Sequence, residues 1–181
     1  QLGPVNAEYL ITADTDDNGI DELIIDLGAG GLKWRQEDGY LYGMTGMDPQ
    51  NIIAVDTDQD ECEEVIADFG AMGLWVCDRG SWAQLTSADA NAMTGLDTVG
   101  IGETALVAGL GGLGTWLWDA GSWTQLSGVR SDRLVTGPML AAGGEEIAGD
   151  FGLLGLWLWS GGGWTQLSGV NADDLTVIDT D

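Results

Sequence analysis

The chain has 181 residues, of which 44% are hydrophobic and 30 are glycine, and it carries 30 acidic side chains against five basic ones. Its net charge of −25 repels phosphate backbones and anionic lipid, and no apolar run is long enough to span a bilayer, so nucleic-acid binding and membrane insertion are disfavoured. Because histidine is absent, Ser/His/Asp catalysis, imidazole acid–base chemistry and most zinc sites are excluded within this chain.

One phrase recurs along the sequence, and its first residue lies at Asp14, Asp56, Asp97, Pro138 and Asp179, spaced by 42, 41, 41 and 41 residues. A repeat of this length that carries four strand-like runs is typical of a blade of a β-propeller. We therefore predict an all-β fold: a β-propeller or propeller-like array of about four four-stranded antiparallel blades, with a surplus strand at the C-terminus.

The repeat divides one domain, residues 1–181, into units. They cover residues 8–50, 51–91, 92–132 and 133–173, with residues 174–181 as a partial fifth unit. Residues 1–7 match the tail of a preceding unit. We expect further blades, or another copy of the chain, to complete the fifth unit; the alternative is that its surplus strand caps an edge locally.

The first unit has a loop rich in carboxylates between its first and second predicted strands. Oxygen-bearing side chains stand at loop positions 1, 3, 5 and 9, and a glycine, Gly19, stands at position 6. With a backbone carbonyl at position 7, such a loop can surround a hard cation with about six or seven oxygens. Calcium suits this donor set better than softer metals, because there is no histidine and no nearby pair of thiolates.

This loop resembles the D-x-[DN]-x-[DN]-G-x-x-[DE] loop of FG-GAP and VCBS-type propeller repeats, the blades also found in integrin α-subunit heads. The following ELIIDLG and EVIADFG runs resemble the family's next strand, and the likeness extends over about four units. It implies a structural calcium ion in the first unit. The implied ligands are the side chains of Asp14, Asp16, Asn18 and Glu22 and the carbonyl of Ile20.

The second loop matches the same family pattern with one exception. Its implied ligands are Asp56, Asp58, Asp60 and Glu64, with the carbonyl of Cys62. Glu61 replaces the turn glycine, which adds strain where a left-handed backbone is wanted and predicts a weaker site. The third and fourth loops lack the side-chain ligands, because apolar residues replace them at Val99, Ile101, Ala105, Pro138, Leu140 and Ala142. Since these two units keep the repeat, the ion is expected to stiffen particular blades and to perform no chemistry.

The second strand of each unit alternates large and small residues on one face and small residues or aspartate on the other, so we expect both faces to be covered. Asp26, Asp68 and Asp150 occupy one repeated position at its end. A carboxylate that recurs there is more typical of a hydrogen bond supporting a turn than of a catalytic acid.

Eight of the nine tryptophans occupy three repeated positions on the third and fourth strands. We expect these indoles to pack between neighbouring blades with their N–H groups bound at an edge. The alternative is a set of exposed platforms for sugar rings. The residues expected to contact a glycan are then Trp82, Gln84, Trp123, Gln125, Trp164 and Gln166.

Two features are confined to single units. In the first unit Lys33 takes the place of the repeated tryptophan, and Trp34 moves to the opposite face of the strand. In the second unit, the expected hairpin register places Cys77 nearer Ile66 than Cys62, so a disulfide would require distortion.

These observations favour a non-enzymatic, extracellular or cell-surface module that binds calcium and serves in adhesion or in structural or filament assembly, as part of a larger propeller. Its expected partners are other blades or copies of itself, another surface protein, or a glycan. The alternative is a glycan-binding lectin that uses the repeated Trp and Gln positions. An enzyme that acts on polysaccharides would need convergent carboxylates outside the metal loops.

Overall fold

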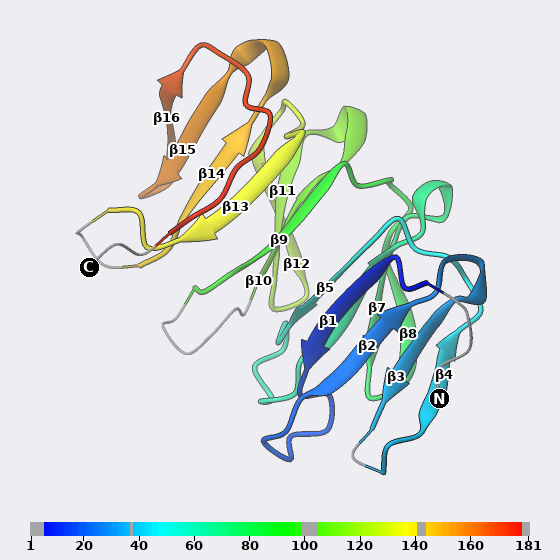
Figure 1. Cartoon of the computed structure of the whole chain (residues 1–181). Coiled ribbons are helices and arrows are strands. Elements are labelled where there is room, and N and C mark those ends of the chain that lie inside the picture. The colour runs from blue at the N-terminus through cyan, green and yellow to red at the C-terminus, as the bar shows by residue number, and fades with distance from the viewer. Residues whose placement is uncertain (1–5, 37, 99–104, 141–143, 179–181) are drawn as a thin grey trace. The chain divides into compact units, whose positions relative to one another are not determined.

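The computed structural model describes residues 6–36, 38–98, 105–140 and 144–178. In these residues the chain forms four antiparallel four-stranded sheets, each built from consecutive strands (Figure 1). The expected all-β, propeller-like fold is therefore confirmed. Its helices are single 3₁₀ turns, and none of the helices in the described segments is long and apolar enough to cross a membrane.

Each sheet contains the four strands predicted for one repeat, in chain order. The first sheet contains β1 (Tyr9–Ala13), β2 (Glu22–Asp26), β3 (Leu32–Arg35) and β4 (Leu41–Thr45). The second contains β5 (Asn51–Val55), β6 (Glu64–Asp68), β7 (Leu74–Asp78) and β8 (Ser81–Thr86). The third contains β9 (Ala92–Leu96), β10 (Ala105–Gly109), β11 (Thr115–Asp119) and β12 (Ser122–Ser127). The fourth contains β13 (Arg133–Gly137), β14 (Glu146–Asp150), β15 (Leu156–Ser160) and β16 (Gly163–Ser168).

Contacts divide the chain into two compact units. Each of these larger units contains two sheets, and therefore two of the sequence repeats, and each is described by itself. The first unit comprises residues 1–55 and 60–89 and includes the first two sheets. The second comprises residues 56–59 and 90–181 and includes the third and fourth sheets.

The second strand of each sheet is buried on both faces, as its alternation predicts. Every residue of β6, β10 and β14 is buried. In the first unit, Ile24 of β2 and the Val65 and Ala67 side chains of β6 belong to one core cluster, against which Trp82 packs. In the second unit, Val107 of β10 and Ile147 of β14 share another.

Short 3₁₀ turns connect the second and third strands: η1 (Gly28–Gly30), η2 (Gly70–Met72), η3 (Gly111–Leu113) and η4 (Gly152–Leu154). In three sheets the aspartate that ends the second strand accepts a hydrogen bond from the backbone N–H two residues later. The oxygens are Asp26 Oδ1, Asp68 Oδ1 and Asp150 Oδ1, with distances of 2.8, 2.9 and 2.9 Å. The repeated aspartate thus supports a turn, as expected.

The indoles of the fourth strands connect neighbouring sheets within each unit. Trp82 Nε1 donates to the carbonyl oxygen of Met44 in the preceding sheet at 3.2 Å, and Trp164 Nε1 donates to that of Leu126 at 2.9 Å. Each indole also lies against a phenylalanine of its own sheet, with ring centroids 5.7 Å apart for Phe69 and 5.0 Å apart for Phe151. At these two positions, the expected packing of tryptophan between blades is confirmed.

The register of β3 confirms the expected change in the first sheet. Lys33 pairs with Ile25 and Gly43, as Trp75 pairs with Ala67 and Gln84 in the second sheet. Trp34 lies one position further along and therefore on the other face.

The cysteine register agrees with the expectation. Cys77 pairs with Val65, the neighbour of Ile66 in β6, whereas Cys62 lies before this strand begins. Cys62 and Cys77 are both free thiols. Burial raises the pKa of Cys77 to about 11, so this thiol is neutral at physiological pH.

The C-terminal segment departs from the expected surplus strand. Residues 174–178 are not a β-strand, and residues 179–181 lie outside the described part of the chain. The segment nevertheless follows β13 (Figure 1), where an alanine Cβ at Gly137 would come within 2.9 Å of Val177 Cγ1. Side-chain packing holds it there, whereas a strand also needs a hydrogen-bonded ladder, which the described residues do not provide.

Candidate metal centres

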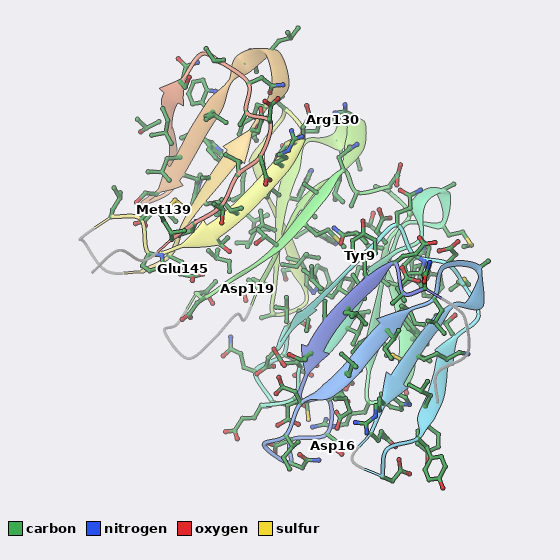
Figure 2. The ribbon with its side chains drawn as sticks, viewed as in Figure 1. Tyr9, Asp16, Asp119, Arg130, Met139 and Glu145 are labelled. Carbon is green, nitrogen blue, oxygen red and sulfur yellow. The ribbon has the colours of Figure 1, made fainter. Side chains whose placement is uncertain are left out.

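The first carboxylate loop brings its acidic side chains together as predicted. Asp14, Asp16 and Glu22 each offer a carboxylate oxygen, and these oxygens lie within 4.8 Å of one another. Two oxygens that share a calcium ion, each about 2.3–2.6 Å from it, are separated by at most about 5 Å. The three carboxylates are therefore close enough to bind one such ion. Figure 2 labels Asp16 on the loop between β1 and β2.

Hydrogen bonds hold this loop in a tight curve. Asp14 accepts from the N–H groups of Asn18 and Gly19 at 3.2 and 2.7 Å, and Asn18 Oδ1 accepts from the N–H of Ile20 at 2.8 Å. A carboxylate or amide oxygen with one such bond keeps a second lone pair. The bonds place Asp14 and Asn18 within the loop and leave them able to bind a cation.

Glu22 is the buried member of the cluster, with 2% of its surface exposed. Its Oε2 accepts from both the backbone N–H of Thr15, at 3.0 Å, and the Thr15 hydroxyl, at 2.6 Å. The two bonds fix the carboxylate at the base of the loop before any ion binds.

The second loop gathers the four predicted carboxylates. Asp56, Asp58, Asp60 and Glu64 offer oxygens that lie within 4.8 Å of one another, and Glu64 is 2% exposed. Asp60 also accepts from the N–H of Cys62 at 3.0 Å and forms an ion pair with Arg79 at 2.5 Å. These contacts, with the Cys62 N–H the larger cause, lower the pKa of Asp60. Arg79 would compete with a cation for this carboxylate, which is a second reason to expect weaker binding here.

Arg79 also reaches Cys62, whose Sγ lies 2.8 Å from a guanidinium nitrogen. Burial is the main cause that raises the pKa of the Cys62 thiol, and the guanidinium opposes it. The thiol is therefore neutral at physiological pH and binds Arg79 as a weak acceptor. The assignment of the side chains in both loops, and of the Cys62 and Ile20 carbonyls, as metal ligands remains a prediction.

The two loops share an unusual backbone. Positive φ angles occur at Asp17 (57°) and Gly19 (79°) in the first loop, and at Gln59 (62°) and Glu61 (72°) in the second. Glu61 thus adopts the left-handed conformation that glycine adopts in the first loop, as expected from the sequence. A non-glycine residue pays about 1–2 kcal/mol for this conformation.

We expect the Glu61→Gly protein to be more stable than the Glu61→Ala protein by about 0.5–1 kcal/mol. Alanine keeps the strain of a positive φ, whereas glycine removes it. Part of the stability that glycine gains is lost because glycine also raises the conformational entropy of the unfolded chain. Both substitutions remove the same side-chain contacts, so their difference isolates the backbone. Urea denaturation measures it, and equal stabilities would contradict a strained backbone at this position.

Two glutamates that sequence reasoning missed connect adjacent sheets within each unit. Glu63 Oε2 accepts from the backbone N–H of Asp14 at 2.9 Å, and Glu145 Oε2 accepts from that of Asp97 at 2.7 Å. The Glu63 N–H in turn donates to the Asp14 carbonyl at 2.8 Å. Both glutamates occupy the eighth position of their own loop. This shared position was the feature of the sequence from which the contact could have been predicted. Each one anchors the first residue of the preceding loop.

The fourth loop keeps the ninth-position glutamate without the other carboxylates. Glu146 is 3% exposed, and its Oε2 accepts from the N–H groups of Met139 and Leu140 at 2.8 and 3.0 Å. A buried glutamate at this position therefore supports the loop without an ion. In the first two loops, other acidic residues join this glutamate and form a cluster of carboxylates. Among the residues expected to lack ligand side chains in the third and fourth loops, Val99, Ile101 and Ala142 lie outside the described residues.

The predicted glycan-contacting glutamines share one arrangement on the outer strands. The Gln84, Gln125 and Gln166 amides donate to the carbonyl oxygens of Met72, Leu113 and Leu154 at 2.9, 3.0 and 3.0 Å. The same carbonyls accept from the indoles of Trp75, Trp116 and Trp157. Each glutamine therefore shares a carbonyl acceptor with the indole of the third strand. The sequence did not predict this association. Trp123 lies against Trp118, with ring centroids 5.1 Å apart.

The second unit contains an apolar pocket of about 210 Å³. It is lined by Ser127, Val129, Phe151, Leu154, Trp157 and Trp164. The pocket thus includes one predicted glycan-contacting residue, Trp164, and the indole paired with Gln166.

No family model matches the chain, and no curated protein matches it. Among solved structures, the chain is similar to BBS1N in complex with ARL6DN in crystals soaked with lead, with a TM-score of 0.64, 12% identity and coverage of 87% of this chain and 52% of that one. For the same complex in crystals soaked with mercury, the TM-score is 0.63 and the identity 14%, with coverage of 87% of this chain and 51% of that one. The chain is also similar to an Agrocybe aegerita lectin that recognises non-reducing terminal N-acetylglucosamine. Here the TM-score is 0.58 and the identity 14%, with coverage of 90% of this chain and 52% of the lectin.

These matches agree with the propeller-like arrangement of four-stranded sheets. At such low identity they show the fold alone. The chain spans about half the length of each of these three chains.

Proposed function

We propose that this chain is a non-enzymatic, calcium-stiffened repeat module of the FG-GAP/VCBS type that acts outside the cell or at its surface. Its role is adhesion or structural assembly, as part of a larger propeller. One observation carries the proposal: each loop with a complete ligand pattern in the sequence gathers its carboxylates within 4.8 Å.

The donor chemistry supports calcium as the ion. Both loops offer carboxylates, backbone carbonyls and, at Asn18, an amide oxygen, which are the ligands of hard cations. The ion would bridge the start of the loop to the buried glutamate at the beginning of the second strand. It would stabilise the connection between the first two strands and supply no reactive group.

The charge and composition of the chain support an extracellular setting. Calcium sites of extracellular modules bind at about 10⁻⁴–10⁻³ M, a modest affinity that the three or four carboxylates of each loop could supply. The neighbouring structures also suit a binding role, since one is a complex with ARL6DN and another is a sugar-specific lectin. For this chain, we propose a protein partner, including other copies of itself.

Isothermal titration of the full chain with calcium tests the loop sites. The Asp14→Asn/Asp16→Asn double variant is expected to lose one binding step, and the Asp56→Asn/Asp58→Asn variant to lose a weaker one, because each change removes ligand charge at constant side-chain size. Asp97→Asn is the matched control: it alters the corresponding residue of the third loop, and calcium binding should not change. Isotherms of both double variants that equal the wild type would rule out calcium at the loops.

A glycan-binding lectin is the second candidate, and the apolar pocket beside Trp157 favours it. An indole face that lines a pocket can stack on a sugar ring, and Gln166 lies next to the same indole.

Titration with N-acetylglucosamine, followed by tryptophan fluorescence, tests the lectin candidate. Trp157→Ala should abolish the fluorescence response, whereas Trp116→Ala, at the same repeat position one sheet earlier, should keep it. No response in the wild-type chain, or an equal loss in both variants, would argue against this pocket as a sugar site.

A further inference from the structure

A third acidic cluster lies in the first unit, away from both loops. Glu8, Asp26 and Asp48 each offer a carboxylate oxygen, and these oxygens lie within 4.8 Å of one another. Glu8 precedes β1, Asp26 ends β2, and Asp48 lies between β4 and β5. The cluster is therefore at the opposite end of β2 from the first carboxylate loop.

Asp26 is the buried centre of this cluster, with none of its surface exposed. Its Oδ1 accepts from the Gly28 N–H at 2.8 Å, whereas its Oδ2 is buried and has no hydrogen-bond partner among the described residues. Burial raises the pKa of Asp26, the Gly28 N–H lowers it, and the nearby Asp48 carboxylate raises it further. A buried carboxylate oxygen normally has a donor or a cation beside it.

The other two carboxylates are exposed at the rim of the cluster. The backbone N–H of Glu8 donates to the Asp26 carbonyl at 2.9 Å, which fixes Glu8 beside β2. The Glu8 carboxylate then lies over Gly28, where a Cβ would collide with Oε1. Glu8, Asp26 and Asp48 form no ion pair with any described residue.

The fourth sheet shows what the same position looks like when donors are present. Asp150, the counterpart of Asp26, is fully buried, and its Oδ2 receives the Arg133 guanidinium at 3.5 Å and the Ala172 N–H at 3.3 Å. The Asn171 side-chain amide also faces this oxygen at 2.8 Å when its nitrogen is oriented to donate. Three donors therefore surround Asp150 Oδ2, whereas the corresponding oxygen of Asp26 has no donor among the described residues.

The first sheet lacks all three of these donors. Tyr9 takes the register position of Arg133, since each pairs with the aspartate of its own sheet. Three repeats before Asn171 and Ala172, the chain has Asp48 and Pro49. Asp48 brings a negative charge in place of an amide donor, and proline has no N–H to donate.

The charge difference between the two sheets is large. In the fourth sheet, Asp132, the counterpart of Glu8, pairs with Arg130 at 3.3 Å, so two carboxylates meet two guanidinium groups. In the first sheet, three carboxylates meet no cation among the described residues. Such a group must either bind a cation or retain a proton.

We propose that Glu8, Asp26 and Asp48 form a third cation site that takes a hard divalent ion, with Asp26 Oδ2 as its buried ligand. The oxygen spacing fits calcium, as in the loops, and the all-carboxylate donor set disfavours softer metals. In the first sheet this ion would neutralise the buried aspartate oxygen, as Arg133 and the Asn171 amide do for Asp150 in the fourth sheet.

The test starts from a full-length variant in which both loops are disabled: Asp14→Asn/Asp16→Asn/Asp56→Asn/Asp58→Asn. Calorimetry with calcium alone is expected to show one remaining site in this background. Adding Asp48→Asn should weaken that site at least about tenfold, because it removes one of three charged ligands. Asp89→Asn is a matched control one repeat later and should leave the affinity unchanged. Asp48 is exposed, and far-UV circular dichroism checks that each variant is folded.

A stability measurement provides an independent readout. In EGTA, Asp48→Asn should be neutral or stabilising, because it relieves repulsion of Asp26, whereas in calcium it should lower the melting temperature. The same shift in both solutions, or calcium binding that is insensitive to Asp48→Asn, would overturn the proposal and leave Asp26 as a protonated carboxyl. Failure of the loop sites would appear instead as a quadruple variant that binds calcium like the wild type, so the two proposals fail separately.

Discussion

Replacing Gly73 by alanine is expected to lower the free energy of unfolding by at least about 3 kcal/mol. Gly73 follows the 3₁₀ turn η2 with φ of 77°, and a Cβ there would collide with the Thr86 carbonyl oxygen and come within 2.7 Å of Ser87 Cα. These are backbone atoms of the neighbouring strand end, so no rotamer change can relieve the contact. The cost combines the strain of a positive φ with displacement of β8 from β7.

Gly80→Ala is the matched control for this prediction. Gly80 lies in the turn between β7 and β8 of the same sheet, with φ of 82°, but the nearest atom to an added Cβ is a Trp34 ring carbon at an ordinary 3.9 Å. Its cost should be about 1 kcal/mol, from backbone conformation alone. Guanidinium denaturation followed by tryptophan fluorescence measures both variants. If the two substitutions cost the same, the close approach of strands at Gly73 does not limit stability.

The second large effect is expected at Leu74, the first residue of β7. This side chain is fully buried, and Leu74→Ala should cost about 2–5 kcal/mol through lost apolar burial and the cavity left behind. Leu156 occupies the same repeat position in β15 but is only half-buried.

Leu156→Ala therefore serves as a control with identical chemistry, and its cost should be smaller by about 1 kcal/mol or more. The comparison is made by denaturation under the same conditions. Equal costs at both positions would mean that burial in the individual sheets does not set the contribution of this repeated leucine.

The local structure of each repeat could be predicted from the sequence because it depends on neighbours in the chain. The spacing of about 41 residues and the alternation of apolar residues indicated four strands per unit, and the structure has them. The aspartate that ends three of the second strands was expected to support a turn. It does so by accepting a hydrogen bond from a backbone N–H only two residues later in the chain. The gathering of Asp14, Asp16 and Glu22 likewise follows from a single short loop.

Contacts between residues far apart in the chain could not be predicted in this way. The sequence did not indicate that Glu63 would bind the backbone of Asp14, because that bond depends on how two sheets pack. The pairing of Gln84 with Trp75 was also missed, since it requires both the cross-strand register and the 3₁₀ turn that supplies their shared acceptor.

The sequence by itself determined the repeat, the strand alternation and the two acidic loops, since all three depend on periodicity and local spacing. Only the tertiary structure decided which carboxylates outside the loops meet. Glu8, Asp26 and Asp48 come from three separate elements, and their charges matter because packing buries Asp26 and removes the water that would otherwise solvate it. The sequence could supply these residues, but only the folded sheets bring their charges into one place.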